Sequence, residues 1–180
     1  DATPTGYYLQ KHVRQDIDIA GSNAAPKEHV WVLFRLAEIY LNLAEAMNEA
    51  FGPNELPDGY IMDAVTAINV VRTRAAVDMP PISDVTTDEL RSLIINERKV
   101  ELAFEDHRFW DVRRWRLYDS DNPNKITEDI YGVVITNNYG ILNYSEKLVD
   151  NRIWDDKMYL FPIPYNEINI NPNLTQNPGW

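Results

Sequence analysis

The stretch FRLAEIYLNLAEAMNEA, residues 34–50, decides the fold of this chain. Its apolar side chains recur at the three- and four-residue spacing of one helix face: Leu36, Ile39, Tyr40, Leu43 and Met47. Gly-Pro follows at 52–53, and a glycine bend before a residue that cannot continue the backbone ladder ends a helix. We therefore expect an amphipathic helix over residues 33–51.

Two further helices are expected downstream. Asp58 has the position of an N-cap for a helix reaching about Ala76, with an apolar stripe that includes Ile61 and Ile68. The short linker favours a helical hairpin of the tetratricopeptide-like (TPR-like) kind. Thr86 and Glu89 have the spacing of a capping box, which predicts that a third helix starts there. Residues 107–118 should continue as an aromatic, Arg-rich helical stretch.

The remainder is predicted to be irregular. Residues 1–32 indicate a leading strand or loop, and residues 119–180 form a turn-rich, extended tail with short strands at 131–135 and 158–161. The expected fold is thus mainly α, a TPR-like helical hairpin plus a further helix over residues 33–118. One helical pair cannot bury its apolar face alone. Either the third helix and the tail cover that face, or earlier helices lie outside this sequence, which we favour.

Composition limits the classes of function. The chain has 180 residues, 44% of them hydrophobic, and a formal net charge of −11, which disfavours nucleic acid and anionic membranes as partners. No run approaches the roughly 18 apolar residues of a membrane-spanning helix. The absence of Cys excludes a disulfide framework and a thiolate nucleophile. Because the sequence starts at Asp1 without a leader, we expect a mature product or a fragment.

Five stretches in order resemble the C-terminal signature of the SusD/RagB family, the nutrient-binding lipoproteins of Bacteroidetes-type outer membranes. They are FRLAEIYLNLAEAMNEA (34–50), AINVVRTRA (67–75), INERKVELAFEDHRFWDVRRW (95–115), YLFPIPYNEI (159–168) and NPNLTQNPGW (171–180).

This resemblance implies that the chain is the C-terminal portion of such a protein, and that it binds nutrient oligosaccharide at the cell surface without catalysis or a cofactor. It implies delivery to a SusC-like TonB-dependent transporter in the outer membrane. Anchoring through a lipidated N-terminal Cys and most of the helical scaffold would then belong to an N-terminal portion outside this sequence. The alternatives are a peptide-binding member of the family, a TPR-like protein–protein interaction module and a hydrolase.

A hydrolase would use the carboxylates of Glu97, Glu101 and Glu105, which follow one another on one helix face. Neighbours four residues apart have Cβ atoms about 5–6 Å apart, which resembles the carboxyl separation of retaining glycosidases. Those enzymes, however, place their acids on opposite sides of the scissile bond. We therefore assign the three glutamates to structural ion pairs with Arg108 or other arginines: Arg72, Arg74, Arg113 and Arg114.

Aromatic rings are the candidates for ligand contact. Tyr131, Tyr139 and Tyr144 lie in the turn-rich region, where loops carry binding specificity. In contrast, the spacing of three helical rings favours packing in the core: Phe109, Trp110 and Trp115. We expect Trp180 to anchor the C-terminus to the body.

No metal site is expected. One oxygen-rich stretch fails the spacing of an EF-hand and is interpreted as a solvated turn: Asp119, Asp121, Asn122 and Asn124. The three histidines have no transition-metal spacing: His12, His29 and His107. We expect His107 to pack between Glu105 and Arg108.

Overall fold

The computed structural model describes residues 3–14, 16–17, 28, 31–126 and 129–180. His29 and much of the expected leading segment lie outside the described residues. The chain divides into two compact units. We call Ile17–Asp111 the helical unit, and Asp1–Asp16 with Val112–Trp180 the hairpin unit.

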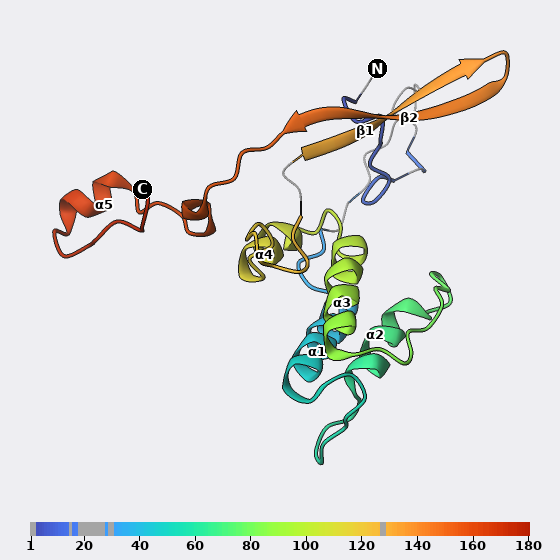
Figure 1. Ribbon diagram of the computed structural model, residues 1–180, viewed down its shortest axis with the longest axis horizontal. Helices are drawn as coiled ribbons and strands as arrows, with labels where there is room; N and C mark the ends of the chain where they lie inside the picture. Colours follow the sequence, from blue (N-terminus) through green and yellow to red (C-terminus); the bar gives the residue numbers. More distant parts are fainter. Residues whose placement is uncertain (1–2, 15, 18–27, 29–30, 127–128) are drawn as a thin grey trace. The chain divides into compact units, whose positions relative to one another are not determined.

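Helix α1, Leu36–Phe51, confirms the first predicted helix (Figure 1). It ends at Gly52, whose φ of 86° suits glycine and whose N–H donates to the carbonyl of Asn48. The predicted buried face was partly wrong, because Leu36 and Ile39 are 66% and 55% exposed. The residues that α1 buries lie on the adjoining face: Leu41, Ala44, Met47 and Asn48.

Helix α2, Ala64–Arg72, is shorter than predicted. Its N-cap is Asp63, whose carboxylate accepts the N–H of Thr66 at 2.6 Å, so the assignment of Asp58 was wrong. The physical reason is Gly59, whose φ of 88° takes the chain out of helical geometry one residue after Asp58.

Helix α3, Thr87–Glu101, starts at the predicted capping box, in which Thr86 and Glu89 bond reciprocally. Phe104 and Asp106 both have a φ of 63°, and this pair of left-handed residues separates α3 from α4, His107–Arg114. The predicted helical stretch therefore ends before Trp115.

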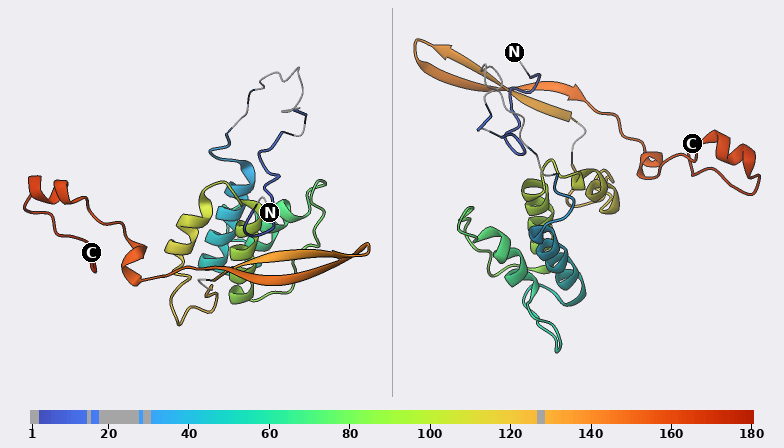
Figure 2. Two further views of the ribbon diagram at one scale, coloured as in Figure 1. Left: turned by 90° about the horizontal axis from the view of Figure 1, so that it is seen from above. Right: turned by 180° about the vertical axis from the view of Figure 1, so that it is seen from behind.

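The core of the helical unit forms where α1 packs against both α2 and α3, which lie beside it in both views of Figure 2. The Nδ2 of Asn48 in α1 donates to the carbonyl of Thr87 at the start of α3, at 2.9 Å. Among the described residues, no helix is both long and apolar enough to cross a membrane. The best-buried side chains of this core are aliphatic, apart from one methionine: Leu41, Ala44, Met47, Ala64, Ala67, Ile68, Leu90, Ile94 and Leu102.

The hairpin unit contains strands β1, Asp129–Asn138, and β2, Ile141–Asn151, paired antiparallel. The predicted strand at 131–135 is confirmed and extends further in both directions, whereas β2 was not predicted. Tyr139 and Gly140 join the strands with φ values of 52° and 91°. Two consecutive positive φ angles identify a type I′ turn, which suits the twist of a two-residue hairpin loop.

The start of the chain lies against β1. The N–H of Val133 donates to the carbonyl of Thr5 at 2.8 Å. Two glycines permit this approach, because a Cβ at Gly132 would lie 2.7 Å from the Cα of Thr5 and one at Gly6 would lie 2.4 Å from the carbonyl oxygen of Val133. Tyr7 is thereby placed beside the hairpin.

The end of the chain holds a 3₁₀ helix, η1, Asp156–Tyr159, and a short helix α5, Tyr165–Ile170. The strand predicted at 158–161 was wrong, because Asp155 caps the N–H of Lys157 and starts a helical turn there. The indole N–H of Trp180 donates to the carbonyls of Lys157 and Leu160 at 3.0 and 3.1 Å. Trp180 thus anchors the C-terminus to η1.

Candidate functional site

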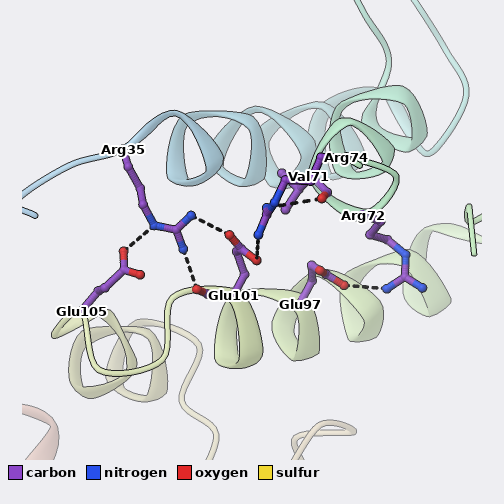
Figure 3. A network of polar contacts seen from close by, with 7 residues as sticks. All are labelled: Arg35, Val71, Arg72, Arg74, Glu97, Glu101 and Glu105. Atoms are coloured by element: carbon purple, nitrogen blue, oxygen red, sulfur yellow. Dashed lines mark hydrogen bonds and ion pairs between the residues drawn. The ribbon is translucent and has the colours of Figure 1, made fainter. Parts of the chain in front are cut away.

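The three glutamates at the end of α3 and beyond it face arginines from elsewhere in the helical unit (Figure 3). Arg35 donates to Glu101 Oε1 at 2.5 Å and to Glu105 Oε2 at 2.6 Å. The other oxygen of Glu101 accepts from Arg74 at 2.8 Å. These two guanidinium groups therefore neutralise the carboxylate of Glu101 from both sides.

Glu97, one turn earlier, accepts from Arg72 Nη1 at 2.6 Å. The same guanidinium donates to the carbonyl of Pro80 through Nε and Nη2, so it also ties down the segment that follows α2. Arg35 was not among the partners expected for these glutamates. Arg108 lies in α4, and its pairing with them stays a prediction.

The electrostatics of Glu101 favour the charged form. Burial raises the pKa of its carboxyl, but the hydrogen bonds and positive charges of Arg74 and Arg35 outweigh burial, and the net pKa is below the ordinary value. A glycosidase acid needs a raised pKa and a free side towards the substrate. Glu101 has an arginine on each carboxylate oxygen and a lowered pKa, which suits an ion pair.

Two further polar contacts hold α4 against the helices before it. Arg98 donates from Nε to Asp111 Oδ2 at 2.9 Å, with both side chains 5% exposed. His107 Nε2 lies 3.6 Å from Glu38 Oε2 in α1. Glu38 was not among the neighbours expected for His107.

Of the tyrosine candidates, two share one face of the hairpin. The register places Tyr131 opposite Leu148, Val133 opposite Glu146, and Ile135 opposite Tyr144. Because opposed residues point to the same side of a sheet, Tyr131 and Tyr144 flank the Val133–Glu146 pair.

Tyr7 from the start of the chain joins these two rings in lining a shallow depression of about 200 Å³. Tyr139 lies instead at the type I′ turn and is fully exposed. No signal in the sequence could have linked Tyr7 to Tyr131 and Tyr144, because the contact depends on the backbone bond between Thr5 and Val133.

The oxygen-rich turn is held by protein contacts. Asp119 accepts from Arg116 Nε at 2.6 Å and from the hydroxyl of Tyr159 at 2.7 Å. Asn122 donates to the carbonyl of Trp115. Burial and the hydrogen bond donated to Asp119 raise the pKa of Tyr159 to about 12. Within the part of the chain that the structure describes, no group of three or more His, Cys, Asp or Glu is placed to hold a metal ion.

The helical rings differ from expectation. Phe109 and Trp110 stack edge-to-face with ring centres 5.1 Å apart, and they are 43% and 57% exposed. The prediction that they pack in the core was wrong, because both side chains are largely exposed to solvent.

Comparison with known proteins identifies the family. The sequence model of the SusD family matches residues 1–180. The SusD-like protein P2 of Formosa agariphila is 31% identical over 170 residues, which cover 90% of this chain and 28% of that protein. The starch-binding protein SusD of Bacteroides thetaiotaomicron is 32% identical over 148 residues, which cover 82% of this chain and 21% of that protein.

A solved structure agrees with these matches. A SusD-like protein from Bacteroides fragilis matches with a TM-score of 0.67 and 37% identity, over 83% of this chain and 26% of that one. The chain therefore spans about a quarter of the length of the relatives it matches. The predicted fold class, a mainly helical SusD-like architecture, is confirmed. With a match along its whole length and a shared fold, this chain belongs to the SusD family.

Proposed function

We propose that this chain is part of a cell-surface protein that binds nutrient oligosaccharide and delivers it to a SusC-like TonB-dependent transporter in the outer membrane. The observation that carries the proposal is the similarity along most of the chain to a relative named for binding starch. The proposal includes a lipid anchor on an N-terminal Cys outside this sequence.

The geometry around α3 supports binding without a covalent step. Hydrolysis of a glycosidic bond needs one carboxyl group to protonate the leaving oxygen and a second to act from the other side. Glu101 and Glu97 are instead engaged by Arg35, Arg74 and Arg72. These contacts join α3 to the start of α1 and to the segment after α2. We therefore interpret these ion pairs as structural, as in a protein that binds its ligand without hydrolysing it.

An exposed apolar face on α1 supports a further partner, the earlier part of the same protein. Leu36 and Ile39 are more than half exposed, and Leu36 lines a groove of about 460 Å³ together with Val70 of α2. Helical-repeat units bury such faces against neighbouring units. Because the relatives are between three and four times as long as this chain, we propose that helices of the remaining sequence cover this face.

The function is tested on the complete protein by isothermal titration with maltoheptaose, xylohexaose, laminarihexaose and tryptic casein peptides. The expected result is binding of at least one oligosaccharide, without release of reducing sugar on long incubation. Binding of peptides alone, or turnover of a glycan, would overturn the proposal. Delivery is tested separately, by purification of the tagged protein from outer membranes, which should bring a TonB-dependent barrel with it.

A further inference from the structure

Three aromatic side chains, two from the β-hairpin and one from the first residues of the sequence, line one depression on a face of the hairpin. Tyr131 and Tyr144 come from opposite strands, and four residue positions along β1 separate them, which is about 13 Å of strand. Tyr7 comes from the start of the chain and lines the same depression, together with Val133, Ser145 and Glu146. The rings of Tyr7, Tyr131 and Tyr144 are 65%, 45% and 65% exposed.

The backbone, rather than packing of the rings, holds this arrangement in place. The Val133–Thr5 hydrogen bond joins Thr5 to the edge of β1, and the lack of a Cβ at Gly6 and Gly132 permits the close approach. The hydroxyl of Tyr131 donates to Asp129 Oδ2 at 3.3 Å, which fixes one ring from the strand beneath it. The backbone positions that carry the three rings are therefore set before any ligand arrives, which lowers the entropy that binding costs.

The chemistry of this face suits an uncharged sugar. Tyrosine rings offer flat apolar surfaces with polar rims, and the C–H groups on one side of a pyranose pack on such a ring. Glu146 lies between Tyr131 and Tyr144, where a carboxylate accepts hydrogen bonds from sugar hydroxyl groups. The carboxylate of Glu146 makes this face negative, so it repels uronic acids and sulfated sugars.

We propose that Tyr7, Tyr131 and Tyr144, with Glu146 between the last two, form a subsite for neutral pyranose units of a glycan. This subsite rests on the proposed function, because it assigns to the hairpin one of the contacts by which the protein holds its oligosaccharide. A volume of about 200 Å³ accommodates a short part of the ligand, so the rest of the glycan lies on other surfaces.

The first test is a footprint on the unmodified complete protein, with maltoheptaose and laminarihexaose as probes and a galacturonic acid hexamer as the anionic comparison. Hydroxyl radicals oxidise exposed tyrosines, and mass spectrometry measures each one. A bound neutral probe should protect Tyr7, Tyr131 and Tyr144 and leave Tyr139 unchanged, because Tyr139 lies outside the depression. Unchanged oxidation of all three rings under a saturating neutral probe would overturn the subsite, as would equal protection by the anionic hexamer or by casein peptides.

The second test uses substitutions. Replacing Tyr131 and Tyr144 together by Ala should raise the Kd for the bound probe about tenfold, since the change removes two of the three rings on which the sugar units pack. The matched control is Tyr139→Asn, which removes a tyrosine from the same hairpin and keeps a residue that accepts positive φ. Its Kd should equal that of the wild type.

The outcomes separate the two proposals. If the wild-type protein binds an oligosaccharide and the double variant binds it equally, the subsite is wrong and the proposed function stands. If the wild-type protein binds no oligosaccharide, the proposed function itself fails and the subsite fails with it.

Discussion

Arg35, the N-cap residue of α1, holds both the side chain and the backbone of Glu101, the last residue of α3. Its Nη1 lies 2.5 Å from Glu101 Oε1, and its Nη2 lies 2.5 Å from the carbonyl oxygen of Glu101. One guanidinium group thus ties the start of one helix to the end of another (Figure 3).

Replacing Glu101 by Gln should lower the free energy of unfolding by about 2–3 kcal/mol. The change keeps the shape of the side chain. It leaves Arg74 without its opposite charge and Arg35 with that of Glu105 alone in a half-buried place, and the partial exposure of both arginines moderates the cost. Urea denaturation measures the change. Glu55→Gln, at an exposed position, is the control and should have no effect. An unchanged midpoint in the Glu101 variant would show that the contact is not structural.

Stability should also fall as the medium becomes acid. The pKa of Glu101 is lower in the folded protein than the ordinary value of 4.5, so its contribution is present above pH 4.5 and is lost as pH falls towards the folded pKa. Denaturation curves between pH 6 and pH 3 should therefore show a smaller decline for Glu101→Gln than for the wild type. If the stability of the two proteins falls equally over this range, Glu101 does not contribute to the pH dependence.

Asp63→Ala should destabilise the protein by about 1 kcal/mol, because the carboxylate that accepts the N–H of Thr66 caps α2. Asp63→Asn should retain most of the stability. Asp58→Ala is the matched comparison from the same linker, and it should have no measurable effect on the thermal midpoint. The opposite ranking of Asp58 and Asp63 would restore the longer helix that the sequence suggested.

A charge on the exposed apolar face of α1 tests whether the rest of the protein covers it. Ile39→Asp should lower the stability of the complete protein by about 2 kcal/mol or more, since it would bury an unpaired carboxylate. Ala46→Asp, at an exposed position on the same helix, is the control. Small and equal losses of stability at both positions would mean that this face of α1 remains exposed to solvent in the complete protein.

Gly132→Ala should release the start of the chain from the hairpin. The new methyl group would lie 2.7 Å from the Cα of Thr5 and 2.9 Å from a methyl carbon of Val149, so one of them must move. Hydrogen exchange at Val133 should speed up. Gly140→Ala strains the turn but meets no atom within 4 Å, and it should leave Val133 protected.

Local signals explain which helices were predictable. The regular spacing of apolar residues in α1 and the capping box of α3 each lie within a short stretch, so both can be recognised in the sequence. The start of α2 was missed because Asp58 and Asp63 are both acceptable caps, and only the positive φ of Gly59 excludes the first. Strand β2 was missed because its polar and apolar residues do not alternate, although Gly140 in the turn was a usable signal.

The candidate site depended on long-range contacts. Arg72 and Arg74 were anticipated as partners of the glutamates because they occur in the preceding helical segment. Arg35 is 66 residues from Glu101, and periodicity does not specify which residue at the start of a helix meets the end of another. Tyr7 was missed for the same reason, because its place depends on a backbone bond made far along the chain.

The bond between Thr5 and Val133 joins residues separated by most of the chain, so its loop closes at a high entropic cost and it should form late in folding, after the helices. Until then the N–H of Val133 lacks this partner at the edge of β1, and such an edge can recruit strands from other molecules. Residues 3–6 should therefore protect this edge against aggregation, and deleting them should lower the yield of soluble protein before it affects any helix.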